Sequence, residues 1–124
     1  MTTIDNTKDT RNNFEKLNVC VLIPTYNNEK TLRQLIEDVL KFTDQIIVVN
    51  DGATDSTPQI LSQFPALTVV TFPVNKGKGI ALREGFKKAL EKSFRYAISI
   101  DSDGQHFPSD FPKFLEKISL EPDS

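Results

Sequence analysis

The chain has no tryptophan and one cysteine, and it lacks both a long apolar run and a surplus of basic charge. A single cysteine, Cys20, cannot form an internal disulfide, which favours a reducing compartment such as the cytoplasm. No apolar stretch approaches the roughly 18 residues that a membrane-spanning helix needs, and residues 1–16 lack the apolar core of a secretory signal. The formal net charge of -2 argues against a nucleic-acid partner, because such proteins usually carry excess Lys and Arg.

What the sequence does have is the length and composition of one small globular domain. Its 124 residues, 38% of them hydrophobic, suffice for a single core but not for two. Residues 1–17 are polar and aperiodic, so we expect a disordered or loosely ordered N-terminal tail there. We expect residues 18–124 to form the folded domain.

Four short β-branched runs follow the tail, and each is apolar without interruption. Continuous apolar runs are typical of parallel strands that are buried on both faces. The predicted strands are residues 19–23, 45–49, 67–72 and 96–100. Between and after them, apolar residues recur at the spacing of a helix face.

Three of the predicted helices have a recognisable apolar face. The first is expected to bury Leu32, Leu35, Ile36, Val39 and Leu40. The helix over residues 78–92 is expected to bury Leu82, Phe86, Ala89 and Leu90. The last begins near Ser109 or Asp110 and is expected to bury Phe111, Phe114, Leu115 and Ile118. Gly85 interrupts the second of these helices at a cost of roughly 1 kcal/mol relative to alanine, which indicates close packing or approach of a ligand.

With a further helix predicted after Ser56, the order of elements is β-α-β-α-β-α-β-α. Right-handed crossovers then give an α/β fold, a three-layer α/β/α Rossmann-like open parallel sheet with helices on both faces. Such sheets bind ligands at the carboxyl ends of their strands, near the point where the strand order reverses. The segments expected at that edge are residues 24–29, 50–55, 73–79 and 101–106.

Three of these segments allow both a ligand-binding and a purely structural interpretation. Tyr26 offers a ring for packing on a base, but PTYNNE also fits a strand-to-helix turn capped by Asn27 or Asn28. Asp51 offers an acceptor to a ribose or a base, with an Asx turn as the alternative, and Asp55 is interpreted as a helix cap. The basic, glycine-rich NKGKG fits against phosphate or forms a solvated loop, and it lacks the spacing of a P-loop.

The fourth segment carries two carboxylates two residues apart. In an extended chain, Asp101 and Asp103 point the same way, about 6–7 Å apart. Mg²⁺ and Mn²⁺ prefer such oxygen ligands and keep positions open for substrate phosphates, and Gln105 could add a carbonyl oxygen. An acidic turn is the alternative. Ser102 faces the other way, toward backbone or ribose, and His106 either touches a phosphate or metal or makes a structural hydrogen bond.

Together these segments resemble the family 2 glycosyltransferases, and within them the dolichyl-phosphate mannose synthase-like branch. The resemblance runs from about residue 18 to residue 118, and its elements stand in the family's order and spacing: VLIPTYNNEKTL, IIVVNDGATDST, NKGKGIALREGFKKAL and AISIDSDGQHFP. It implies the nucleotide-binding half of a type A glycosyltransferase (GT-A) fold. It also implies inverting transfer of a sugar from a nucleoside diphosphate to an acceptor, for which a polyprenyl (lipid) phosphate is one candidate.

The resemblance also implies roles for individual residues. Pro24 and Tyr26 would border the nucleobase, Asp51 would bind base or ribose, and Lys78 would approach the diphosphate. A cofactor, Mg²⁺ or Mn²⁺, would neutralise charge on the departing diphosphate. The implied metal site comprises Asp101, Asp103 and Gln105. The implied nucleotide-sugar site comprises Pro24, Tyr26, Asn28, Glu29, Val49, Asp51, Lys78, Asp101 and Ser102.

Two positions depart from the family pattern. Where the family often has PxYNE, Asn28 occupies the glutamate position and Glu29 follows, which leaves open which of the two contacts the ligand. The usual Asp-Asp before glycine is Asn50-Asp51 here, so only Asp51 carries the implied role.

The resemblance places the acceptor half, and any general base, beyond Ser124, so no catalytic residue is assigned. We therefore expect the nucleotide-sugar-binding part of a longer protein, with little transfer by the chain itself and self-association through exposed apolar surface. One alternative is a non-catalytic metal–nucleotide binding module. Another is a haloacid dehalogenase-type phosphatase, whose hhhDxDG motif belongs on an early strand with further catalytic groups well downstream. The sequence does not identify the sugar, the nucleobase or the acceptor.

Overall fold

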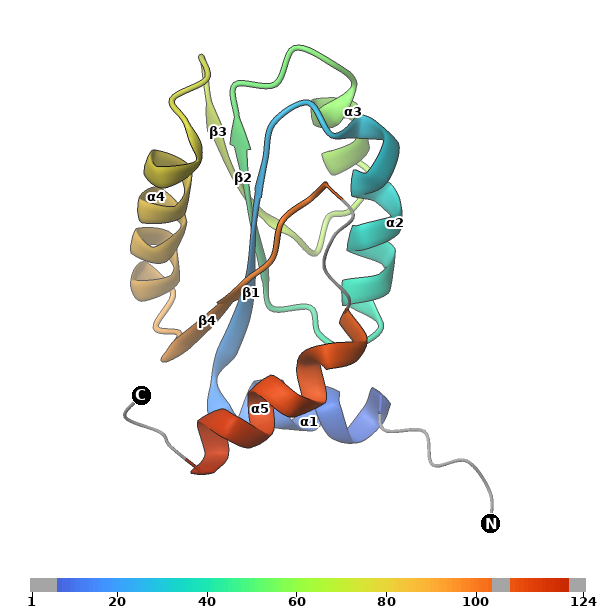
Figure 1. The fold of residues 1–124 in the computed structure, drawn as a ribbon, viewed down its shortest axis with the longest axis vertical. Coiled ribbons are helices and arrows are strands. Elements are labelled where there is room, and N and C mark those ends of the chain that lie inside the picture. The colour runs from blue at the N-terminus through green and yellow to red at the C-terminus, as the bar shows by residue number, and fades with distance from the viewer. Residues whose placement is uncertain (1–6, 104–107, 121–124) are drawn as a thin grey trace.

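The computed structural model describes residues 7–103 and 108–120. Its strands form one parallel sheet in the order β3-β2-β1-β4 (Figure 1). The strands are β1 Val19–Thr25, β2 Ile46–Asp51, β3 Thr68–Phe72 and β4 Tyr96–Ser99. The helices are α1 Thr7–Leu17, α2 Glu29–Leu40, α3 Thr57–Leu61, α4 Lys78–Glu91 and α5 Phe111–Leu120, with the 3₁₀ turn η1 Pro108–Asp110 before α5. The predicted α/β/α architecture is confirmed.

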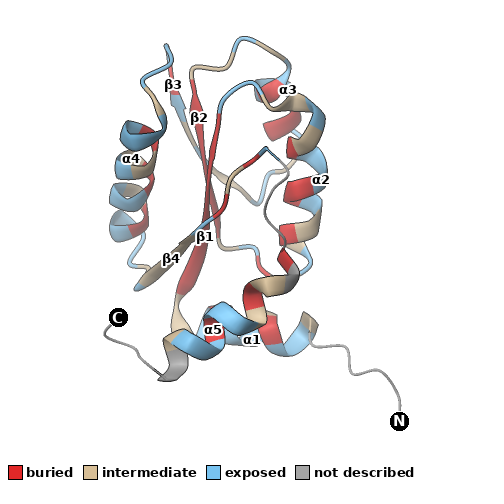
Figure 2. Cartoon of the chain, in the orientation of Figure 1, coloured by how far each residue is buried: buried red, intermediate tan, exposed pale blue. Residues whose placement is uncertain are grey.

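The sheet lies between helices on both faces, and β1 shows this directly. Val19, Val21 and Ile23 pack into a core cluster with α2 and α3, whereas Cys20 and Leu22 pack into a second cluster with α4. The clusters lie on opposite faces because successive side chains of a strand point to opposite sides. All residues of β1 and β2 are buried (Figure 2), which explains the continuous apolar runs at residues 19–23 and 46–49.

The two outer strands are more exposed than the sequence predicts. β3 and β4 are the edges of the sheet in the part of the chain that the structure describes. Val69 in β3 is 41% exposed, and β4 has intermediate or exposed residues throughout. An edge strand has a neighbour on one side only, so an apolar run does not guarantee burial on both faces.

Helix α4 packs on the sheet through its smallest residues. Ala81, Gly85 and Ala89 are its buried positions, and a Cβ built on Gly85 would lie 2.3 Å from Leu22 Cδ1. The interpretation of Gly85 as a close-packing residue is therefore confirmed.

The predicted inward face of α4 is wrong in two of its positions. Phe86 is 44% exposed and Leu90 is 75% exposed. Leu82 is partly buried, and Ala89 is buried as predicted. At the separation that Gly85 allows, the space between helix and sheet admits only small side chains, so the bulky ones are turned outward.

The N-terminal segment differs from the expected loose tail, because residues 7–17 form helix α1. Phe14 is fully buried and meets Phe111 of α5 edge to face, with ring centroids 5.3 Å apart. Gln45 Nε2 donates to the backbone oxygen of Phe14 at 3.1 Å, and Arg11 pairs with Asp44 at 3.3 Å. The buried ring of Phe14 is the main apolar anchor of this helix, and Leu17 packs beside the core. Two apolar residues in a polar segment are too weak a pattern to predict a helix from the sequence.

Helices α1 and α5 lie side by side at the amino-terminal end of β1 (Figure 1). In α5, Phe111 and Leu115 are buried as predicted and Ile118 is partly buried, but Phe114 is 45% exposed. The prediction for Phe114 is wrong, because α5 covers the core with only one stripe of its surface. Within residues 7–103 and 108–120, no helix has the length and apolar character to cross a membrane.

The strand order fixes where a site can form. The chain runs outward from β1 through β2 to β3 and then returns to the other side of β1 as β4. The order therefore reverses beside β1, and the carboxyl ends of β1, β2 and β4 face one region at the edge opposite α1 and α5 (Figure 1).

Candidate nucleotide-sugar and metal site

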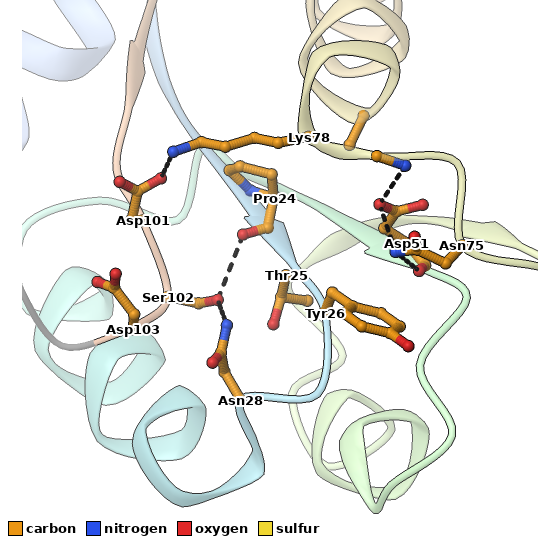
Figure 3. A pocket seen from close by; sticks show the side chains of 12 residues that line it. Pro24, Thr25, Tyr26, Asn28, Asp51, Asn75, Lys78, Asp101, Ser102 and Asp103 are labelled. Carbon is orange, nitrogen blue, oxygen red and sulfur yellow. Dashed lines mark hydrogen bonds and ion pairs between the residues drawn. The ribbon is translucent and has the colours of Figure 1, made fainter.

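A cavity of about 270 Å³ opens at this carboxyl edge (Figure 3). The expected site residues that line it are Pro24, Tyr26, Asn28, Asp51, Lys78, Asp101, Ser102 and Asp103. They come from all four segments that the sequence placed at strand ends. The cavity is also lined by four residues that the sequence reasoning did not single out: Thr25, Asn75, Gly77 and Ala81. Thr25, Asn75 and Gly77 lie inside the segments predicted at this edge, without an individual role, and Ala81 lies two residues beyond one of them.

Lys78 and Asp101 face each other across the cavity. Lys78 is the first residue of α4, and its ammonium group pairs with the Asp101 carboxylate (Figure 3). The side chains are 59% and 29% exposed, respectively. Asp103 is exposed on the same side of the cavity as Asp101, with Ser102 between them.

The acidic pair fits a hard divalent cation. Asp101 already accommodates one cationic group, the Lys78 ammonium, and Asp103 stands beside it. Mg²⁺ is bound in proteins by one or two carboxylates together with substrate phosphates and water. Within the described ranges, no group of three or more His, Cys, Asp or Glu side chains could hold a metal. Gln105 and His106 lie outside the described residues.

Ser102 is 2% exposed and makes contacts with three neighbouring residues. Asn28 Nδ2 donates to Ser102 Oγ at 2.7 Å, and Ser102 Oγ donates to the Pro24 carbonyl oxygen at 3.3 Å (Figure 3). Thr31 Oγ1 donates to the Ser102 carbonyl oxygen. The sequence left open whether Ser102 contacts backbone or a ribose. In the structure its hydroxyl donates to a backbone carbonyl, that of Pro24.

Asp51 is 3% exposed and holds the loop that leads into α4. Its carboxylate accepts hydrogen bonds from the backbone N–H groups of Lys76 at 2.7 Å and Gly77 at 3.0 Å. Asn75 Nδ2 donates to the same carboxylate at 3.0 Å. These contacts tie the NKGKG loop to the end of β2, while four of its five residues remain exposed to solvent.

Gly52 allows this loop to approach the end of β2 closely. Its φ of 70° lies in the left-handed region, and a Cβ at this position would stand 2.2 Å from the carbonyl carbon of Val74. A side chain is excluded there both by backbone conformation and by space.

Asn28 and Glu29 lie differently relative to the cavity. Asn28 lines the cavity, whereas Glu29 Oε2 accepts from the backbone N–H of Ser56 at 2.8 Å. Glu29 lines only a neighbouring cavity of about 340 Å³, whereas Asn28 and Asp103 line both cavities. Val49 is fully buried in the core cluster under α4 and does not line the site cavity.

Asp55 caps two helices rather than one. Its carboxylate accepts from the backbone N–H of Glu29 at 3.2 Å and from that of Thr57 at 2.9 Å. Partial burial tends to raise the pKa of Asp55, but the hydrogen bonds from Thr57 and Glu29 outweigh it and lower the pKa below its ordinary value. The interpretation of Asp55 as a cap is confirmed. Asn28 makes no side-chain cap bond to α2.

Tyr26 lies at the mouth of the cavity and is 45% exposed. The preceding residue, Thr25, is 2% exposed, and its hydroxyl has no hydrogen-bond partner among the described residues. An open aromatic ring, a buried carboxylate, a lysine and an acidic pair thus meet at the carboxyl edge of an open parallel sheet. This fold is that of the nucleotide-binding half of the GT-A glycosyltransferases, and the candidate site lies at the edge where such sheets bind ligands.

Comparison with known proteins agrees with this class. Residues 20–124 match the family described as glycosyl transferase family 2, and the chain belongs to that family. The resemblance drawn from the four motifs is confirmed, and family membership decides against the phosphatase alternative.

The chain is similar to two enzymes named for dolichyl phosphate. It is 30% identical to a UDP-N-acetylglucosamine–dolichyl-phosphate N-acetylglucosaminyltransferase of Methanococcus voltae, over 81% of this chain and 47% of that protein. It is 29% identical to the dolichyl-phosphate beta-glucosyltransferase of Saccharomyces cerevisiae, over 85% of this chain and 35% of that protein. The chain therefore spans less than half the length of these relatives.

A solved structure shows the same fold. Glucosyl-3-phosphoglycerate synthase from Mycobacterium tuberculosis superimposes with a TM-score of 0.70 at 22% identity, covering 95% of this chain and 45% of that one. That enzyme was solved in complex with Mn²⁺, uridine diphosphate and glucosyl-3-phosphoglycerate.

Proposed function

We propose that residues 18–124 bind the nucleoside-diphosphate-sugar donor of an inverting glycosyltransferase. The observation that carries this proposal is the meeting of Asp101, Asp103 and Lys78 in one cavity with Tyr26 and Asp51. One end of the cavity offers a ring and a carboxylate for a nucleoside, and the other offers charges for a diphosphate and a cation. Family membership supports the reaction class.

The nucleoside end of the proposed site uses Pro24, Tyr26 and Asp51. The exposed ring of Tyr26 packs on the base, and the Pro24 ring borders it. Asp51 has a double role in this proposal: it ties down the loop of residues 75–77 and offers its remaining acceptor capacity to base or ribose. The relative named for UDP-N-acetylglucosamine supports a nucleoside-diphosphate sugar as the donor class.

The diphosphate end uses Lys78 and the acidic pair. Asp101 and Asp103 hold Mg²⁺ or Mn²⁺, and the cation supplies neutralisation of the charge that develops on the leaving diphosphate. Lys78 stands at the start of α4, on the opposite side of the cavity, and is placed to pair with a phosphate oxygen. The cationic side chain and the metal carboxylates therefore approach the diphosphate from two sides.

The acceptor that we propose is a polyprenyl phosphate. The two relatives named for dolichyl phosphate support this class of acceptor. Such an acceptor places the whole protein at a membrane surface, and the single reduced cysteine, Cys20, favours its cytoplasmic face. No general base is assigned among the described residues, and we expect little sugar transfer from the 124-residue chain alone.

Calorimetry tests the proposal on the purified chain. UDP-glucose, UDP-N-acetylglucosamine and GDP-mannose are titrated with and without Mn²⁺ into the wild type and into the double variant Asp101→Asn/Asp103→Asn. We expect one donor to bind in the presence of Mn²⁺ and binding to be lost in the double variant. Asp38→Asn, a charge change on the outer surface of α2, is the matched control and should bind like the wild type. Donor binding that needs neither Mn²⁺ nor the two aspartates would contradict the proposal.

A further inference from the structure

The segment with the acidic pair leaves the sheet just before its first carboxylate. The backbone N–H of Ile100 donates to Leu22 O at 3.0 Å, which continues the pairing of β4 with β1 by one residue. Asp101, Ser102 and Asp103 follow as non-strand residues. Two metal ligands on a segment outside the sheet are not held by strand pairing, so other contacts must fix their positions. Without such contacts, binding of a cation would cost the entropy of ordering both carboxylates.

We propose that Ser102, anchored by Asn28 and Thr31, is the positioning residue that aims both carboxylates into the cavity. This inference rests on the proposed metal-dependent donor binding and adds the residues that preorganise it. Ser102 is 2% exposed, whereas Asp101 has 29% of its side chain exposed and Asp103 is exposed. The middle side chain of this turn is therefore the buried one, and the carboxylates before and after it line the cavity.

The anchor has three hydrogen bonds, and they tie Ser102 to two separate elements. Its hydroxyl donates to the Pro24 carbonyl at 3.3 Å and accepts from Asn28 Nδ2 at 2.7 Å. Its carbonyl accepts from the hydroxyl of Thr31, in the first turn of α2. Both the side chain and the backbone of Ser102 are held, so neither rotation of the side chain nor shift of the peptide is free.

Asn28 gives the hydroxyl its direction. The amide N–H can only donate, so the Ser102 oxygen accepts from Asn28 and its own proton is left for the Pro24 carbonyl. An ionised glutamate, the residue that the family often has at this position, can only accept. A glutamate there would accept the hydrogen bond that the Ser102 hydroxyl now donates to the Pro24 carbonyl, and the bond to Pro24 would be lost. The asparagine is therefore matched to the serine of this D-S-D segment.

The test measures Mn²⁺ affinity by the loss of the free-ion electron paramagnetic resonance signal, in the presence of UDP. Variants Ser102→Ala and Thr31→Val remove the two hydroxyl groups of the anchor, and Thr31→Ser keeps the hydroxyl. We expect Mn²⁺ affinity to fall about tenfold in Ser102→Ala and in Thr31→Val. This is the lower end of the roughly 10- to 100-fold loss that follows when residues hydrogen-bonded to metal ligands are replaced. Thr31→Ser should restore affinity to within about twofold, since it retains the donor.

Asn27→Ala is the control for the neighbouring turn. Asn27 exchanges hydrogen bonds with Thr54 rather than with Ser102, and this variant should bind Mn²⁺ like the wild type. Circular dichroism at the temperature of the titration establishes that each variant is fully folded, so that lost affinity is not lost structure.

Two results overturn the inference while leaving the proposed function intact. One is wild-type affinity in both Ser102→Ala and Thr31→Val while Asp101→Asn abolishes binding. The other is equal weakening by Thr31→Val and Thr31→Ser, which would assign the effect to packing rather than to the hydroxyl. Wild-type affinity no better than that of Asp101→Asn would instead overturn the proposed metal site itself, and the anchor with it.

Discussion

The ammonium group of Lys78 and the carboxylate of Asp101 form an ion pair across the cavity, between the first residue of α4 and the segment that follows β4. The pair joins the two sides of the cavity to which we assign the diphosphate. A cation that binds Asp101 must therefore share this carboxylate with Lys78 or displace it, and the displaced ammonium is then available to a phosphate.

Replacement of Lys78 by alanine should have opposite effects on the two ligands. Mn²⁺ alone should bind about two- to fivefold more tightly, because an exposed ion pair contributes roughly 0–1 kcal/mol and no longer competes. UDP with Mn²⁺ should bind more weakly, since a charged partner of the diphosphate is lost. Titration calorimetry measures both affinities.

Lys88→Ala is the matched control for Lys78→Ala. Lys88 also belongs to α4 and pairs with Glu91 at 2.9 Å on its surface. Both affinities should remain at the wild-type value in this variant. Equal weakening of Mn²⁺ and UDP by Lys78→Ala would contradict competition between the ammonium and the metal.

Asp51→Asn should lower both stability and nucleotide affinity. The neutral amide has one oxygen for the N–H groups of Lys76 and Gly77, and its NH₂ group opposes a backbone donor in a buried place. One buried donor left without a partner costs about 1–3 kcal/mol in the free energy of unfolding. Urea denaturation followed by circular dichroism measures this loss. Unchanged stability would show that Asp51 does not hold the loop.

Gly85→Ala should destabilise the fold although alanine favours helices. The new Cβ would lie 2.3 Å from Leu22 Cδ1 and 2.8 Å from Cδ2, in a fully buried place. Overpacking of this kind costs about 1–3 kcal/mol, against a gain of roughly 1 kcal/mol in helix propensity. Gly79→Ala, in the same helix with open space at its Cβ, should be neutral or stabilising. Urea denaturation compares the two variants. A lower free energy of unfolding for Gly79→Ala than for Gly85→Ala would contradict the close packing of α4 on Leu22.

The lowered pKa of Asp55 predicts a contribution to the free energy of unfolding that is lost in acid. Its pKa is lower in the folded chain, so it contributes fully above the pKa of an unfolded aspartate, about pH 4. The contribution is lost as pH falls through the lower folded pKa. The stability difference between the wild type and Asp55→Asn should therefore be constant near neutral pH and shrink below about pH 4. A stability difference between the wild type and Asp55→Asn that grows as the pH falls would contradict a lowered pKa of Asp55 in the folded chain.

The sequence predicted the strands and α2 well because their burial follows the local pattern. Residues 19–23 of β1 and 46–49 of β2 are continuously apolar since both faces are covered, and Leu32 and Ile36 recur at helix spacing. The face of α4 could not be predicted in this way. Phe86 and Leu90 are more apolar than Ala81 and Gly85, yet close approach to Leu22 selects the small residues for the interface.

The site was predicted as a set of strand ends, and its internal contacts depend on tertiary structure. The motifs place Asp51, Lys78 and Asp101 at one edge, but no pattern shows that Asn75 would hold Asp51 or that Lys78 would pair with Asp101. These partners lie more than twenty residues apart in the chain. Their pairing follows from how the loops pack once the sheet has formed.

The most direct test of the account is the thermodynamic linkage between Mn²⁺ and UDP on the wild-type chain. Affinity for UDP is measured by calorimetry with and without Mn²⁺, and affinity for Mn²⁺ with and without UDP, after correction for the complex that the two form in solution. If Asp101 and Asp103 hold a cation that the diphosphate shares, each ligand should raise the affinity of the other by the same factor. This coupling should vanish in Asp101→Asn/Asp103→Asn. Independent binding of the two ligands to the wild type would contradict a shared metal–nucleotide site.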